Sequence, residues 1–341
     1  MRQARMRTQR GVALIIILML VAIMAAIAAT MSERLFTQFK RVGNQINHQQ
    51  AYWYAIGAEA LAKKAIEQSY KDDKDSVNLS QPWAKQAMTF PLDYGTLKGR
   101  IVDKQACFNL NALASVTSST SSTASPYLVQ VLQHLIDTTG IDGYQAETIA
   151  KSTWSYVSNS QSVQGITGIN DSQYESLSPA YLPADGLMAD SSEFRAVSGV
   201  TGKVMLQLQP LLCALPNTEW ALNVNTIQPE QANLLVALFY PNLSESNAKD
   251  LIASRPKKGW TSVSDFMSSS VLAALSEETR TSAEKYLAID SAYFGMDAQV
   301  FVGESRVRIR SLLFSKDRKT ATVIRRRFGG IIERVPDRSS K

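Results

Sequence analysis

The sequence has few histidines and few cysteines, and both shortages narrow the chemistry open to the protein. Its 341 residues include only two histidines, His48 and His134, and two cysteines, Cys107 and Cys213. The sequence contains no nucleophile elbow, no metal-ligand cluster and no phosphate-binding loop. We therefore expect a protein that is not an enzyme.

Two cysteines are too few for a disulfide scaffold or for a metal site made of four thiolates. A single bridge between Cys107 and Cys213 stays open, because two cysteines of a folded domain often pair in an oxidising compartment. Two separate buried side chains are the alternative, since no spacing rule decides the pairing.

The net charge gives little reason to expect a nucleic-acid partner. Four of the six net positive charges belong to Arg2, Arg5, Arg7 and Arg10, and only +2 remains without this stretch. With 45% hydrophobic residues, the chain can bury one core and has room for a second. A chain that is disordered as a whole is excluded.

Residues 12–31 form a run of twenty amino acids with no charge, no glycine and no proline. At a rise of about 1.5 Å per residue, a helix of this length spans roughly 30 Å, the thickness of the hydrocarbon layer. The arginines before it hold that end in the cytoplasm. We therefore predict a single-pass membrane protein whose N-terminus is cytoplasmic and whose bulk lies on the other side of the membrane.

The helical pattern does not stop where the membrane-spanning run ends. Apolar residues recur at helical spacing across 32–70, and no proline occurs before Pro82. A secretory signal would instead have a shorter apolar stretch with a cleavage site after it. We predict one helix from about residue 12 to residue 70, with 12–31 in the membrane and 32–70 against a periplasmic domain.

The remaining chain has strand patterns at both ends and helical patterns between them. Segments 90–106 and 289–330 carry β-branched and aromatic runs with turn residues between them, which predicts an antiparallel sheet. Segment 107–288 is mostly helical, in two halves of about 107–213 and 214–288, with a Ser/Thr-rich linker at 115–125. The predicted class is α+β, with a large α-helical domain inserted into a sheet domain.

A weak internal repeat relates the two halves, since residues 108–113 match residues 222–227 at an offset of 114. The simpler interpretation is that each asparagine pair caps a helix and fixes a turn. The alternative is a DNA-binding helix-hairpin-helix, with 140–143 as its glycine hairpin. Asp142 would then face the phosphate, and the second copy, around 240–244, has no glycine at all.

The junction at residues 9–14 resembles the cleavage site of type IV prepilins and pseudopilins, in which a short basic leader ends in glycine before a long apolar helix. The resemblance implies a leader at 1–11, cleavage between Gly11 and Val12, and N-methylation of Val12. The alternative is an uncleaved signal anchor. Most pilins of this class carry glutamate at the fifth mature position, where it neutralises a neighbour's N-terminal amine. This chain has Ile16 there, which suggests a subunit with no other subunit ahead of it.

The leader, the missing glutamate, the helical insertion and the late strands together resemble the type II secretion minor pseudopilin K family, also called general secretion pathway protein K. Its most specific motifs are matched at 109–111, 193–200 and 223–226. The resemblance implies a pseudopilin fold, in which a long N-terminal helix packs on an antiparallel sheet.

The family also implies a function and partners. Its members sit with minor pseudopilins I and J at the tip of a periplasmic pseudopilus and start or cap it, for export of folded proteins across the outer membrane. The implied partners are these two proteins, the major pseudopilin, prepilin peptidase, the inner membrane, and either the secretin or an exported substrate. A membrane-tethered DNA receptor of the competence type and an anchored enzyme are the competing classes.

Some similar proteins bind calcium in an acidic loop between the helical halves. Here the matching segment 168–171 retains only one acidic residue, and calcium needs about six to eight oxygen ligands. Asp171, Glu175 and Asp185 are the remaining candidates for a calcium site, and a solvated loop is the alternative.

Overall fold

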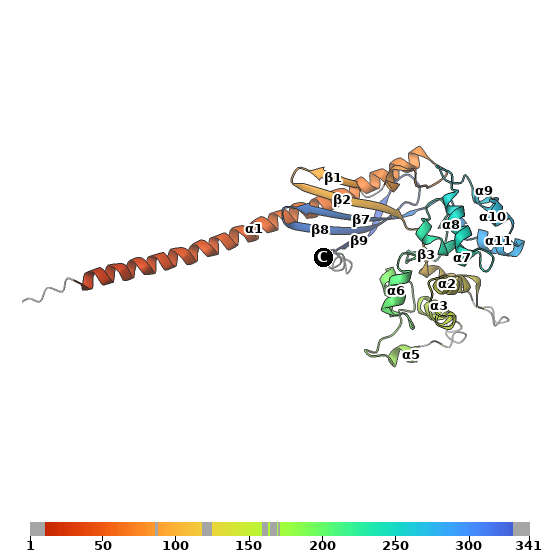
Figure 1. The fold of residues 1–341 in the computed structure, drawn as a ribbon, viewed down its shortest axis with the longest axis horizontal. Coiled ribbons are helices and arrows are strands. Elements are labelled where there is room, and N and C mark those ends of the chain that lie inside the picture. Colours follow the sequence, from red (N-terminus) through yellow and green to blue (C-terminus); the bar gives the residue numbers. More distant parts are fainter. Residues whose placement is uncertain are drawn as a thin grey trace, which may run out of the picture.

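A computed structural model describes residues 11–85, 88–117, 125–158, 163, 169 and 171–329. One long helix, α1, runs along a five-stranded sheet and continues far beyond it (Figure 1). The helices between the strands gather at the opposite end of the sheet. The predicted leader lies almost wholly outside the described residues, as do 118–124 of the predicted linker and the last residue of the predicted sheet segment.

Helix α1, Val12–Asp72, extends for 61 residues, two residues past the predicted end. Its buried residues begin at Ala51, and small side chains recur there at Ala55, Ala58 and Ala62. These alanines lie on one face because they are three or four residues apart. Small side chains let the helix axis approach the sheet closely, so the second half of α1 forms a core with the strands.

The sheet has the order β1-β2-β7-β8-β9, and every pair of neighbouring strands is antiparallel. Its strands are β1 (Met88–Leu92), β2 (Gly95–Asp103), β7 (Tyr293–Val302), β8 (Ser305–Phe314) and β9 (Thr322–Phe328). The first predicted sheet segment is thus a hairpin, and its second strand pairs with a strand almost 200 residues away, Arg100 lying opposite Asp297. The whole helical domain is inserted between β2 and β7.

One ion pair, between a buried carboxylate and a partly exposed arginine, joins α1 to the far edge of the sheet. The Glu59 carboxylate accepts two hydrogen bonds from the Arg326 guanidinium of β9, at 2.8 Å and 2.5 Å, and a third from the Ser311 hydroxyl of β8. Glu59 is only 3% exposed. Two parallel N–H donors on one carboxylate restrict both distance and angle, so this pair fixes the rotation of α1 against the sheet.

The inserted domain consists of short helices around one apolar core. Its first half contains η2 (Leu110–Ser115), α2 (Tyr127–Asp137), α3 (Gly143–Val157), α5 (Asp171–Glu175), η3 (Ser191–Ala196) and α6 (Gly202–Leu208). Its second half contains η4 (Pro229–Gln231), α7 (Asn233–Leu238), α8 (Glu245–Ala253), α9 (Val263–Met267), α10 (Ser270–Ala273) and α11 (Glu277–Glu284).

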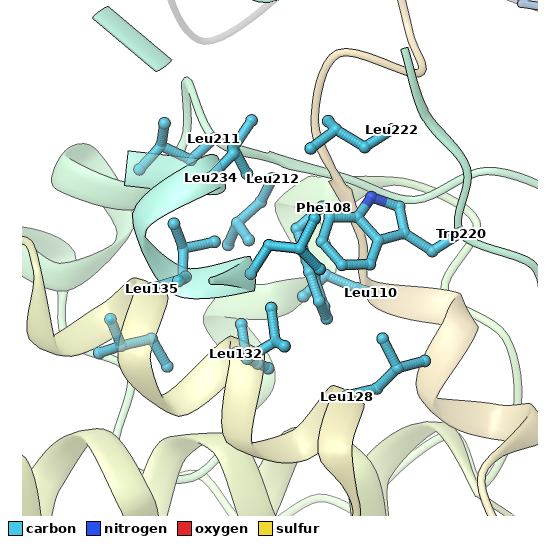
Figure 2. Packing of buried hydrophobic residues seen from close by; sticks show 14 of the residues in the cluster. Phe108, Leu110, Leu128, Leu132, Leu135, Leu211, Leu212, Trp220, Leu222 and Leu234 are labelled. Carbon is cyan, nitrogen blue, oxygen red and sulfur yellow. The ribbon is translucent and has the colours of Figure 1, made fainter. Parts of the chain in front are cut away.

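The core of the insertion spans both of its halves. Leucines of α2 point towards Leu234 of α7, and Trp220 and Phe108 lie beside them (Figure 2). The Phe108 and Trp220 rings are 4.7 Å apart. Because the apolar side chains of the two halves share one core, the insertion is a single packing unit.

Two short parallel strand pairs, which the sequence did not predict, bring the ends of each half together. Strand β3 (Phe108–Asn109) pairs with β4 (Leu212–Cys213), and β5 (Leu222–Asn223) pairs with β6 (Leu287–Ala288). The structure joins Cys107 and Cys213 in a disulfide, with Cα atoms 5.9 Å apart and 106 residues between them in sequence. The first half is therefore closed both by a strand pair and by a covalent bond.

The internal repeat is a repeated set of asparagine contacts. The Asn109 and Asn223 side chains each accept a hydrogen bond from the backbone N–H two residues later, so the predicted turns are confirmed. Asn111 exchanges hydrogen bonds with the backbone of Met188, and Asn225 does the same with Trp260. Each asparagine satisfies buried backbone groups that would otherwise have no partner.

A second polar centre lies where the sheet meets the insertion, at the end of β2. The Asp103 carboxylate accepts hydrogen bonds from Thr226 (2.6 Å), Ser291 (2.5 Å) and Asn223 (3.1 Å), and from the backbone N–H of Gln105. Burial raises the pKa of Asp103 to about 6, although these donors favour the charged form. One carboxylate thus connects β2, the second half of the insertion and the segment that leads into β7.

The pH dependence of stability tests this junction. Because the folded-state pKa of Asp103 is about 6 and that of an unfolded aspartate is about 3.9, the folded protein binds this proton more tightly. Between these two values the free energy of unfolding therefore rises as the pH falls. From about pH 7.5 to about pH 4.5, Asp103 contributes an increase of about 2 kcal/mol.

We expect Asp103→Asn to lack this contribution, because an amide does not titrate. Urea unfolding of the wild type and the variant at both pH values measures this contribution. The difference between the two proteins removes the effect of every other carboxylate, because both proteins share those groups. The stability advantage of the wild type should be about 2 kcal/mol larger at the lower pH. An advantage that is the same at both pH values would show that Asp103 is not held in this buried site.

Candidate assembly interface

The first half of α1 leaves an apolar surface uncovered by the rest of the described chain. The helix is long and apolar enough to cross a membrane, and none of its most apolar stretch is buried. Among the described residues it is the one helix that meets this test. Apolar surface of this extent in water is unfavourable and needs lipid or another apolar surface to cover it. This helix agrees with the predicted single-pass membrane protein.

The predicted cleavage and methylation residues lie at the very start of this helix. Gly11 is the N-cap and has no side chain to bond the first backbone N–H groups, and no acidic residue lies in the first turn. Val12 is 50% exposed and Ile16, one turn later, is 53% exposed. Ile16 therefore puts an aliphatic side chain on the surface of the helix, close to the end where a carboxylate would neutralise an amine.

An apolar stripe continues along α1 past the membrane-spanning stretch. Leu35, Phe39, Val42 and Ile46 follow each other at three- or four-residue intervals and are between 51% and 74% exposed. Such spacing places side chains on one face of a helix. Because the first buried residue of α1 is Ala51, this stripe is free to contact a neighbouring helix.

The residues predicted to bind calcium are only partly brought together. Asp171 begins α5 and Glu175 ends it, whereas Asp185 follows in a loop with φ of 45°. Burial raises the pKa of Asp185, and the Asp171 carboxylate adds to the increase. In the described part of the chain, one Asp185 carboxylate oxygen is buried without a hydrogen-bond partner.

These contacts fit a calcium ion in part. A partly buried Asp185 carboxylate that the nearby Asp171 makes harder to ionise, with one unpaired oxygen, is what a bound cation would stabilise. The described residues contain no group of three acidic, His or Cys side chains placed to share a metal ion, so Glu175 does not join the pair. The other residues of the predicted loop motif, Gly168 and Asn170, lie outside the described residues. The calcium site stays a prediction.

The helix that follows the glycine hairpin suspected of binding DNA phosphate has two of its first backbone donors engaged. It connects α2 to α3, and the Asp142 side chain accepts hydrogen bonds from the N–H groups of Tyr144 and Gln145. In the second copy the Ser244 hydroxyl accepts from the N–H of Asn247 at the start of α8. Helix N-termini capped in this way do not offer those N–H groups to a phosphate.

Neither histidine lies among groups that suit catalysis. His134 stacks on Tyr240 with ring centroids 3.5 Å apart, and burial lowers its pKa, an effect that Asp137 partly opposes. His48 lies on the exposed part of α1.

The sequence did not reveal one contact that orients the insertion. Arg325 and Arg327 of β9 both approach Asp190, which caps η3, at 3.5 Å and 3.0 Å. Arg326 between them points to α1 instead. Successive side chains of a strand point to opposite faces. The sequence could therefore have shown that Arg326 faces the other way from Arg325 and Arg327, but it could not have identified their partners.

Comparison with known proteins identifies the same architecture elsewhere. A family model described as "Type II secretion system (T2SS), protein K" matches residues 106–217, and a second model with this description matches residues 222–290. Together these matches cover almost the whole insertion and more than half of the chain.

Relatives match along nearly the full length. Type II secretion system protein K of Aeromonas hydrophila is 37% identical, covering 95% of this chain and 98% of its own. The Klebsiella pneumoniae protein of that name is 34% identical, over 94% and 97%. A chain in the crystal structure of the GspK-GspI-GspJ complex from enterotoxigenic Escherichia coli is 36% identical with a TM-score of 0.78, over 85% of this chain and 99% of that one. The chain therefore belongs to the type II secretion system protein K family.

Proposed function

We propose that this chain is the minor pseudopilin at the tip of the type II secretion pseudopilus, where it starts or caps the filament. The observation that carries the proposal is the uncovered first half of α1, which has Ile16 in place of an acidic residue. A shaft subunit needs an acceptor for the amine of the subunit ahead of it. A subunit at the end of the filament does not.

The size of the insertion supports the same position. It extends from residue 107 to residue 288 and gathers at the end of the sheet away from the exposed part of α1 (Figure 1). Such a body would obstruct subunits stacked along a shaft, whereas at the end of a filament it has free space. The exposed stripe of α1 is then the surface on which the following subunits assemble.

The partners follow from the relative of known structure. That protein forms a complex with GspI and GspJ, so we propose minor pseudopilins I and J as the partners of this chain. Prepilin peptidase would cut between Gly11 and Val12, Val12 would be methylated, and the arginines of the leader would hold the N-terminus in the cytoplasm. The major pseudopilin would form the filament behind this tip, and the secretin or an exported substrate would lie in front of the tip.

Substitution of Ile16 tests the tip position. We expect Ile16→Glu to reduce secretion several-fold, because the new carboxylate either stays unpaired in lipid, at a cost of about 3 kcal/mol, or recruits an amine that does not belong ahead of this subunit. The measurements are the amount of secreted substrate in the medium and the amounts of pseudopilins I and J that co-purify with the full chain.

Ile16→Gln is the matched control, because glutamine has the size of glutamate without its charge. We expect it to retain most of the secretion. Unchanged secretion by Ile16→Glu would leave the missing carboxylate without a role, and a full chain that never co-purifies with I and J would refute the tip position itself.

We also propose that Asp171 and Asp185 hold a calcium ion, with backbone carbonyls and water as further ligands and Glu175 as an outer candidate. The buried, unpaired oxygen of Asp185 supports this.

A ligand that binds only the folded protein raises its stability, by about 2.7 kcal/mol at a hundredfold excess over Kd. We therefore expect a melting temperature several degrees higher in calcium than in EDTA, and no such difference for Asp171→Asn/Asp185→Asn. Equal melting temperatures for the wild type in calcium and EDTA would exclude the site.

A further inference from the structure

The outer face of the sheet, which points away from α1, is rich in cations. On β7 and β8 the side chains of Met296, Ala298, Val307 and Ile309 face α1 and form the core. Their sequence neighbours face outwards, because side chains alternate along a strand. Outward positions on β2 and β8 hold Lys98, Arg100, Arg306 and Arg310. We call these four residues the open basic face.

Strand register places these cations side by side. Arg100 lies opposite Asp297, Asp297 opposite Arg310, and Arg310 opposite Arg327, so one row across four strands has three arginines and one aspartate. Neighbouring strands are about 4.8 Å apart, and at such distances like charges repel unless an anion lies between them. The next row, from Lys98 to Arg308, adds further positive charge.

The insertion and the sheet neutralise only some of these cations. Asp297 binds the Arg308 guanidinium through two hydrogen bonds, at 2.9 Å and 2.6 Å. Asp190 of the insertion pairs with Arg325 and Arg327 at the β9 edge. No carboxylate of the described residues forms an ion pair with any member of the open basic face.

Two members of the face are held in place without being neutralised. The Arg306 guanidinium lies over the Phe301 ring, 5.8 Å from its centroid, which orients its donors and leaves them available. Arg310 donates one hydrogen bond to the Gly329 carbonyl, while its buried Nε has no hydrogen-bond partner. Such fixed guanidinium groups bind carboxylates well, because little side-chain freedom remains to be lost.

The geometry selects the kind of partner. A lipid surface is too far away, since the sheet first contacts α1 at Asn44. Asn44 is about 20 Å along the helix from Met31, whereas charges are screened within about 8 Å. A nucleic-acid backbone presents a continuous row of phosphates, whereas the Asp297–Arg308 pair interrupts the row of arginines that would contact it. A protein surface offers separate carboxylates, which can pair with the cations on either side of Asp297.

We propose that the open basic face docks an acidic protein surface, whose carboxylates pair with Lys98, Arg100, Arg306 and Arg310. At the filament tip this outer face would point away from the bundle of helices and remain accessible. The proposal goes beyond the tip position, and its binding assay does not depend on that position.

A decaglutamate peptide tests the proposal as a probe of carboxylate binding. The full chain in neutral detergent is titrated into the fluorescent peptide, and its anisotropy is followed at low and at moderate salt. We expect Lys98→Glu/Arg100→Glu to weaken binding at least about fivefold relative to the wild type, because complementary charges at an interface attract and reversed charges repel. Salt should weaken wild-type binding more than it weakens binding by this variant.

Lys257→Glu/Lys258→Glu is the matched control, because it changes the net charge equally at two exposed lysines of the insertion. We expect less than about a twofold loss, since those residues lie outside the face. Equal losses in both variants would overturn the proposal, as would absence of wild-type binding at low salt. Duplex DNA or phosphatidylglycerol vesicles serve as competing probes. If either binds the wild type more tightly than the peptide does, and Lys98→Glu/Arg100→Glu abolishes that binding, the proposal is overturned in favour of that partner.

Discussion

The exposed apolar surface of α1 is the constraint on which the other features depend. Its second half lies against the sheet through small side chains, and the Glu59–Arg326 pair fixes its rotation. Its first half has no cover within the described chain. A protein built in this way must place that half in a membrane or among other helices, so the folded domain and the assembly surface share one continuous helix.

The insertion is held to this frame by polar contacts and by one small apolar cluster around the disulfide. Asp103 joins the sheet to the second half of the insertion, Asp190 joins the first half to β9, and the disulfide lies against the ends of β7 and β8. Polar contacts depend strongly on direction. They therefore orient the insertion, while Lys98, Arg100 and Arg306 of the open basic face stay exposed within the described part of the chain.

The sequence predicted the elements that repeat a local pattern. The helix over 12–70, the late strands and the helical insertion all follow from apolar spacing, and the asparagine turns follow from the chemistry of their side chains. It did not predict that β2 pairs with β7, that Arg326 binds Glu59, or that Asp103 lies buried, because each depends on residues about 120 to 270 positions apart. The three acidic residues proposed for calcium were chosen by composition. Asp171 acts electrostatically on Asp185, but the described residues contain no cluster of three such side chains placed to share a metal ion.

The mature N-terminus tests the central claim most directly, because filament assembly through α1 requires that this helix remain attached after the basic leader is removed. Intact-mass analysis of the full chain purified from membranes would identify it. We expect a polypeptide that begins at N-methylated Val12. A mature protein that begins downstream of Met31 would lack the apolar half of α1 and could not assemble through it.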